Sequence, residues 1–382
     1  MRAGKRKLAL AADFLGSYGL SCILFVLLLL LTFLGTAEQV QSGLYEVQQR
    51  YFQSLIVVHW LFNVVPVPLP GAFLLLGILL VNLVIGGIAR ARKDWARCGI
   101  LAAHIGIIVL LAGGFAKFMY AETGHLTLFE GEQSNQFESY YDWETVLAAH
   151  SADEAVEYLI PEAQLPQFSA GEVTYIHPDV PFRLRFTNHL RNARPRLENG
   201  AVEMHAALSQ RSPEYRLPAV EVHVEERGGV IAEDWLWGGQ RMPLAFESNG
   251  QTWTLDLRRK QTQLPFALAL RDFTVVRHPG THLPKSFVSE ITRIENGVRQ
   301  NVTISMNKPM RHRGYTLYQS GWGPQDAGPN ERLYTVLAVS HNPFERWPLY
   351  ASVIIMLGLA YHFSVKLLRH LIAVRSAPEF GK

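Results

Sequence analysis

Four long apolar runs constrain the fold of this chain more than any other feature of its sequence. A helix needs roughly 20 apolar residues to cross a hydrocarbon layer about 30 Å thick. Runs of that length lie at residues 17–36, 70–89, 98–118 and 346–366. Hydrophobic residues make up 48% of the 382-residue chain, and they are clustered in these runs. The sequence predicts an integral membrane protein with four transmembrane helices.

Basic residues flank these runs in a pattern that predicts the topology. Segments rich in lysine and arginine stay on the cytoplasmic side of a membrane. Such residues fall in three groups: Arg2, Lys5, Arg6 and Lys7; Arg90, Arg92, Lys93 and Arg97; and Lys366, Arg369, Arg375 and Lys382. Four crossings put all three groups on the cytoplasmic side and leave residues 119–345 facing outward. The formal net charge of +3 therefore reflects topology. No basic stripe with interleaved aromatic residues is present, so we expect no nucleic-acid partner.

The runs divide the chain into three parts. An N-terminal membrane part, residues 1–118, is expected to hold three transmembrane helices and an amphipathic interfacial helix over about 44–65. Residues 119–345 are expected to form an extracytoplasmic domain. Residues 346–382 are expected to hold the fourth transmembrane helix, about 346–366, and a cytoplasmic tail.

The outward domain has the pattern of a β-rich fold. Residues 125–131, 182–188, 220–226 and 252–259 alternate apolar and polar side chains with the period of a half-buried strand. Asn296-Gly297, between two alternating runs, is typical of a β-hairpin turn. Residues 143–163 favour one or two short helices instead. We expect a sandwich-like or open-barrel-like domain.

Cysteines exclude two kinds of chemistry. The chain has two, Cys22 and Cys98, and both lie in the membrane part. No C-x-x-C or C-x-x-C-H sequence occurs. The outward domain therefore carries no thiol chemistry, and the chain does not attach haem covalently to itself.

His104 is the residue in the apolar runs with the clearest potential for chemistry. An ionisable residue inside a span costs about 2–3 kcal/mol on insertion scales and is a functional candidate for that reason. It has small neighbours, Ala102, Ala103 and Gly106, that let a helix or a flat ligand approach. One interpretation is a neutral histidine bonded to the backbone of another helix. The other is an axial ligand to haem iron. His59 and His362 are weaker candidates for such a ligand.

The outward domain offers no motif for a catalytic or zinc site. Its histidines are scattered apart from His278 and His282, which lie in a loop held by proline and glycine, and no H-E-x-x-H, G-x-S-x-G or Walker sequence occurs. The sequence therefore predicts no catalytic residue in this chain and no metal apart from haem iron.

Two segments of the outward domain are distinctive: "LPFALALRDFTVVRHPGTHLPKSFVSEITRIENG" from residue 264 and "ISMNKPMRHRGYTLYQSGW" from residue 304. In these segments the chain resembles the ResB family, also called CcsB, a membrane component of System II cytochrome c biogenesis. Four segments of the first half agree as well: "GT" after the first run, "HWLF", "NLVIGGI" and "GHLTLFEGEQSNQF". Residues 140–260 are the most divergent part.

The resemblance implies a role in handling haem in the bacterial inner membrane. In the family, the protein and a CcsA- or ResC-type partner move haem across the membrane. They present it to the reduced C-x-x-C-H cysteines of apocytochrome c, which other proteins keep reduced. His104 matches the family's third-span ligand to transmembrane haem b, and the partner supplies the second ligand. The resemblance places cytochrome c synthase chemistry mainly on the partner.

Two other functions stay open at the level of sequence. A membrane-anchored assembly scaffold without a cofactor would use His104 for packing alone. A subunit that transfers electrons through b-type haem would need several intramembrane histidines, and few are present. For contact with the partner or with apocytochrome, the aromatic residues Tyr315, Tyr318 and Trp322 are candidates; an ordinary strand at the edge of a core is the competing interpretation.

Overall fold

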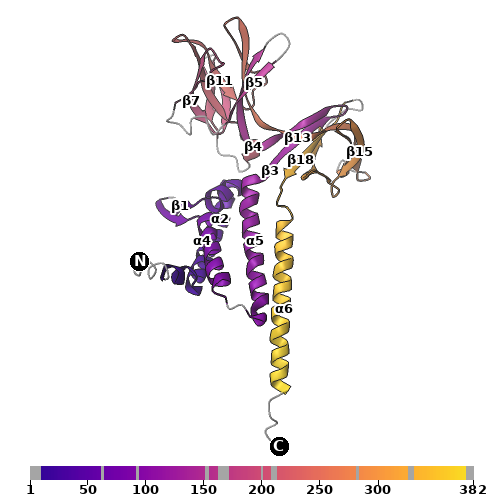
Figure 1. The fold of residues 1–382 in the computed structure, drawn as a ribbon. Helices are drawn as coiled ribbons and strands as arrows, with labels where there is room; N and C mark the ends of the chain where they lie inside the picture. Colours follow the sequence, from indigo (N-terminus) through magenta and orange to yellow (C-terminus); the bar gives the residue numbers. More distant parts are fainter. Residues whose placement is uncertain are drawn as a thin grey trace, which may run out of the picture. The chain divides into compact units, whose positions relative to one another are not determined.

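The protein divides into two compact units. The computed structural model describes residues 10–61, 64–91, 94–150, 155–161, 172–198, 201–207, 213–280, 284–325 and 331–375. One unit comprises residues 1–121 and 342–382, and the other comprises residues 122–341 (Figure 1). The basic residues predicted to be cytoplasmic at positions 2–7, 92–93 and 382 lie outside the described residues.

The first unit contains four helices that are long and apolar enough to cross a membrane, as predicted. They are α2 (Tyr18–Ser42), α4 (Ala72–Asn82) with its π-helical continuation η2 (Leu83–Ala89), α5 (Cys98–Tyr120) after the short turn η3 (Trp95–Arg97), and α6 (Trp347–Arg375). Ser17 begins α2, because its hydroxyl accepts a hydrogen bond from the Leu20 amide at 3.2 Å.

Helices α5 and α6 lie side by side (Figure 1) because small residues let their backbones meet. Gly99, Ala103 and Gly106 form a buried face of α5. A β-carbon at Gly106 would lie 2.6 Å from Ile355 Cγ1 and 2.9 Å from the Ala351 carbonyl oxygen. Any larger side chain there would force the two helices apart.

The interfacial helix predicted over 44–65 is wrong for most of that range. Helix α3 (Leu44–Val47) continues into the π-helical η1 (Gln48–Phe52), where helical structure ends. Strands β1 (Ile56–Leu61) and β2 (Val65–Pro70) then form an antiparallel hairpin. The β-branched run "IVV" and the alternating prolines of "VPVPLP" explain the difference, because β-branched residues suit strands and proline interrupts a helix.

The second unit is β-rich, as predicted, and is built on two long strands, β4 (Gln133–His150) and β13 (Gln251–Arg277). These strands pair with each other along most of their length and pass through both of its hydrophobic cores. Its remaining strands are β3 (Glu122–Phe129), β5 (Ala155–Pro161), β6 (Val173–Tyr175), β7 (Arg183–Leu190), β8 (Ala193–Glu198), β9 (Ala201–Ala206), β10 (Ala219–Glu226), β11 (Gly229–Trp237), β12 (Leu244–Ser248), β14 (Pro284–Glu295), β15 (Val298–Ser305), β16 (Met310–His312), β17 (Tyr315–Gly323) and β18 (Tyr334–His341).

The two cores belong to two sheets. The sheet β11-β10-β7-β6 covers the first core, to which Trp143, Phe186 and Trp253 contribute. The second core lies within a nearly closed, barrel-like sheet in the order β15-β14-β13-β4-β3-β18-β17-β16. The Asn296-Gly297 turn joins β14 to β15, as its sequence predicts, and both residues have positive φ.

The short helices predicted within 143–163 are wrong where the structure describes the chain. Residues 143–150 end β4, and residues 155–161 form β5; residues 151–154 and 162–163 lie outside the described part. Strand β4 runs here between β13 and β5, and every residue from 143 to 149 is buried. Continuous burial removes the alternation that identifies a strand, so this segment has the sequence pattern of a helix.

Candidate functional site

His104 lies on α5, and its imidazole reaches the preceding helical segment. Its Nδ1 is 3.0 Å from the Gly87 carbonyl oxygen of η2. A carbonyl oxygen can only accept, so Nδ1 carries the ring proton and donates it. The neutral ring then keeps its lone pair on Nε2. Of the two interpretations of the sequence, a bond to another helix's backbone is therefore present, and it leaves the second nitrogen free to bind a metal.

Helix termini explain why the Gly87 carbonyl is available. Segment η2 ends at Ala89, and the last carbonyl groups of a helix have no amide partner within it. Glycine at this position is also a steric requirement. A β-carbon on Gly87 would lie 2.8 Å from Nδ1 of His104 and 3.2 Å from its Cε1. The "GG" of the second apolar run thus forms the close contact for the histidine of the third.

The Nε2 atom of His104 has no hydrogen-bond partner among the described residues. Asn82, another polar residue in these helices, provides the contrast. It is buried, its Nδ2 donates to the carbonyl oxygens of Leu15 and Ser17 at 2.6 and 3.0 Å, and its Oδ1 accepts from Ser21 Oγ at 2.7 Å. Asn82 therefore joins α2 to α4 and has no capacity left for a ligand. Its structural role had no signal in the sequence.

The residues present fit one axial ligand to haem iron. Metal-binding histidines commonly donate their second ring nitrogen to a carbonyl or carboxylate, which fixes the tautomer and the orientation of the ring. His104 and Gly87 have this arrangement. A separate apolar groove of about 400 Å³, whose lining does not include His104, lies between α5 and α6. The groove is lined by Trp95, Cys98, Gly99, Ala102, Ile354, Leu357, Gly358 and Tyr361.

His362 and His59, the weaker candidates, have different surroundings. His362 lies on the side of α6 that faces α5, close enough that a β-carbon on Gly99 would be 2.9 Å from its Cβ. Its Nδ1 is buried without a hydrogen-bond partner among the described residues. His59 lies on β1, and its Nδ1 is 2.5 Å from the hydroxyl of the buried Tyr51. That contact gives His59 a structural role in holding the hairpin to η1.

The three aromatic contact candidates lie on β17 but have unequal access to solvent. Tyr315 stacks on His341 with ring centroids 4.3 Å apart, and Trp322 packs on Phe273 at 6.0 Å. Both border the second core. Tyr318 is the exposed member, with 41% of its surface accessible. A partner could therefore reach Tyr318 without rearrangement, whereas Tyr315 and Trp322 are mainly core residues.

Comparisons with known proteins confirm the resemblance over part of the second unit. Residues 228–330 match the model of the ResB-like family. A cytochrome c biogenesis protein CcsB of Synechococcus sp. (strain CC9902) is 38% identical over 69 residues, which are 18% of this chain and 16% of the relative. The CcsB protein of Synechococcus sp. (strain RCC307) is 34% identical over 90 residues, 23% of this chain and 20% of the relative.

A third relative has a lower sequence identity to this chain. Protein NrfI of Wolinella succinogenes is 25% identical over 105 residues, which are 27% of this chain and 11% of the relative. The matches thus span a fifth or less of the length of each of these relatives. His104 and Gly87 lie outside the residues that match the family model.

Proposed function

We propose that this chain is a subunit of a cytochrome c biogenesis complex and binds haem in the membrane through His104. The matched family region and the CcsB relatives support the pathway. The observation that supports the haem site is the imidazole itself, with Nδ1 held by Gly87 and Nε2 without a partner among the described residues. A histidine retained only for packing has no need of a free nitrogen in an apolar helix.

The chain acts in this proposal with a second membrane protein of the CcsA or ResC type. Iron in haem takes two axial ligands, and the structure offers a single well-oriented one on α5. The partner provides the other, so the haem is bound between two proteins. Haem here is cargo that crosses the inner membrane and is presented outside to the C-x-x-C-H cysteines of apocytochrome c. The reducing proteins that keep those cysteines as thiols act indirectly.

His104 has one task in this process, which is to hold and release the iron. The bond to Gly87 keeps the ring in one tautomer and one orientation, so Nε2 is ready to bind without a proton being lost first. The basic residues Arg90 and Arg97 favour a cytoplasmic location for the start of α5. A ligand within two turns of that end suits the capture of haem from the cytoplasm.

The test is the haem content of the complex purified with its co-expressed CcsA- or ResC-type partner. We expect His104→Ala to remove most of the b-type haem absorbance per complex, and His59→Ala to leave it unchanged. Equal haem in wild type and His104→Ala would contradict the proposal and favour the cofactor-free scaffold. Loss of haem only in His362→Ala would assign the ligand to α6 instead.

A further inference from the structure

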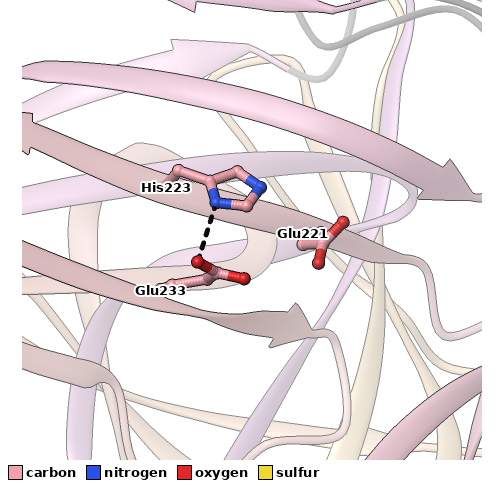
Figure 2. A group of neighbouring side chains, drawn as sticks. All are labelled: Glu221, His223 and Glu233. Atoms are coloured by element: carbon pink, nitrogen blue, oxygen red, sulfur yellow. Dashed lines mark ion pairs between the residues drawn. The ribbon is translucent and has the colours of Figure 1, made fainter. Parts of the chain in front are cut away.

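Strands β10 and β11 bring together the side chains of Glu221, His223 and Glu233. Glu221 and His223 lie on one face of β10, because residues two apart in a strand point the same way. Glu233 on β11 is the direct cross-strand partner of His223. One ligand atom from each of the three residues lies within 4.8 Å of the others (Figure 2).

The tautomer of His223 directs a lone pair toward Glu233. Its Nε2 is 3.4 Å from Thr187 Oγ1, and that hydroxyl donates its proton to Glu221 Oε2 at 2.9 Å. The Thr187 oxygen can then only accept from Nε2, so Nε2 carries a proton and the lone pair of the neutral ring lies on Nδ1. Nδ1 is buried, has no hydrogen-bond partner among the described residues, and lies 3.2 Å from Glu233 Oε2 (Figure 2).

The lone pair of a neutral ring and a carboxylate oxygen at that distance repel each other, and either a second ring proton or a metal ion between them removes the repulsion. The 3.2 Å separation also suits a shared metal ion. Zinc binds imidazole nitrogen and carboxylate oxygen at about 2.0–2.2 Å, so the edge of its coordination tetrahedron is about 3.4 Å. Only the carboxylate of Glu221 has to move closer.

The Glu221 carboxylate is oriented by the neighbouring strand β7. Thr187 and Asn188 both donate to its Oε2, at 2.9 and 2.6 Å, which leaves Oε1 for a ligand. Consecutive residues can do this because the pairing of β7 with β10 shifts at this point and Asn188 has a positive φ of 47°. A bulge of this kind redirects a side chain. Such hydrogen bonds to ligating carboxylates are typical of metal sites.

The charges around the three side chains favour a divalent cation. Two carboxylates and a neutral imidazole carry a net charge of −2. Arg185, the cross-strand neighbour of His223 on β7, is a competing cation and interacts electrostatically with Glu233. Its Nε contacts Glu225 at 2.7 Å and Glu172 at 3.4 Å. These two carboxylates lie outside the cluster and offset much of the charge of Arg185.

We propose that Glu221, His223 and Glu233 bind a divalent transition-metal ion of the zinc type. Imidazole nitrogen and carboxylate oxygen are ligands that Zn²⁺ accepts, and three protein ligands leave a fourth position for water. The site is independent of His104 and of haem. It lies on the solvent side of the sheet β11-β10-β7-β6, whose other side covers the first core.

The experiment measures Zn²⁺ bound to the full-length protein in detergent, by competition with a chromophoric chelator after removal of metal with EDTA. Wild type should take up about one equivalent. Both His223→Gln and Glu233→Gln should weaken that binding by about tenfold or more. His150→Gln, an exposed histidine at the end of β4, is the matched control and should bind as wild type does.

Thermal unfolding of the same samples separates binding from folding. In EDTA, the wild type and Glu233→Gln should unfold at similar temperatures, because Glu233 is half-exposed. Added Zn²⁺ should raise the midpoint of the wild type and not of Glu233→Gln. The proposal is overturned if wild type binds no Zn²⁺, or if Glu233→Gln and His223→Gln bind it as tightly as wild type.

Discussion

At the scale of single residues, the contact between His104 and Gly87 fixes the orientation of the imidazole. The carbonyl oxygen of Gly87 accepts the Nδ1 proton at 3.0 Å, and the absence of a side chain at Gly87 allows the ring to come that close. The free nitrogen of His104 and the glycine that faces it are therefore parts of one site. A substitution of either residue should affect haem.

Gly87→Ala tests this relation without touching the ligand. Its added methyl group would lie 2.8 Å from Nδ1 of His104, so the ring must rotate away or the hydrogen bond must lengthen. Loss of such a supporting bond typically weakens metal binding by 10–100-fold. We expect the haem content of the purified complex to fall by about tenfold. Gly77→Ala is the control, since a β-carbon there meets nothing within 4 Å. Equal haem in both variants would contradict the role of Gly87.

The half-buried ring of His125 predicts that the stability of the β-rich unit depends on pH. Burial lowers the pKa of this ring, the nearby Glu138 carboxylate opposes that effect, and the Arg259 charge adds to it. Because the folded state favours the neutral ring, the contribution of His125 to the stability of the folded state is fully present above the ordinary histidine pKa of about 6.5. That contribution is lost as the pH falls through this value toward the lowered pKa of the folded state.

The measurement is the thermal midpoint of the protein between pH 7.5 and pH 5. The wild type should lose stability over this interval, and His125→Phe should lose less, because phenylalanine can keep the stacking on Tyr140, 5.3 Å away, and has no proton to bind. If the two proteins follow the same pH profile, His125 does not contribute to it.

The sequence pattern identifies some of these residues as candidates for a functional site and gives no indication of others. His104 stands out because a polar ring in an apolar run is costly. Gly87 lies 17 residues away on another helix, and only the packing of η2 against α5 makes it the partner. The pairing of His223 with Glu233 likewise depends on the register of β10 and β11, which composition does not encode. Spacing rules for zinc motifs therefore miss this cluster.

At the scale of elements, the contact between α5 and α6 leaves little space for side chains. It depends on glycines at which two backbones approach closely, as at Gly99, where a β-carbon would lie 2.3 Å from the Gly358 carbonyl oxygen. Lipid offers no hydrophobic drive for helix association, so close van der Waals packing holds such helices together.

Gly106→Leu should separate this pair of helices. Overpacking a tight contact costs about 1–3 kcal/mol, and the nearest obstacle is Ile355 Cγ1 at 2.6 Å. We expect a lower midpoint of thermal unfolding in detergent. Gly114→Leu on the same helix is the matched control, because a β-carbon at Gly114 meets nothing within 4 Å. A Gly106→Leu midpoint no lower than that of the control would show that the two helices are not packed as described.

Helices and strands of this protein differ in how well their secondary structure can be predicted from the sequence. The spans are clear because membrane thickness sets their length. The β1–β2 hairpin has apolar and aromatic residues that also suit an interfacial helix, and the β-branched run of β1 and the prolines of β2 argue against that helix. Strand β4 is buried on both faces near its end, so its apolar residues do not alternate. Both errors arise where local pattern and tertiary surroundings disagree.

At the scale of the whole molecule, the four helices and the charges beside them predict on which side each unit lies. The segment around Arg90 and Arg97 is expected in the cytoplasm and the β-rich unit on the other side of the membrane. Cys98, an exposed cysteine at the start of α5, reports on the first of these sides.

Thiol labelling of intact spheroplasts tests this topology. With Cys22 replaced by serine, a membrane-impermeant maleimide should react with Cys98 only after lysis. A second variant, Glu247→Cys in a background without native cysteines, places a thiol on an exposed position of β12 and should react before lysis. The opposite order would reverse the topology, and His104 would then lie near the outer side.

If His104 binds haem iron through Nε2, free imidazole should replace its side chain in a variant that lacks it. His104→Gly, purified with the co-expressed partner, removes the imidazole and leaves space for a free one. We predict that its b-type haem spectrum is weak and changed in character, and that added imidazole restores the wild-type spectrum. A His104→Gly complex with the wild-type haem spectrum before any imidazole is added would contradict the claim.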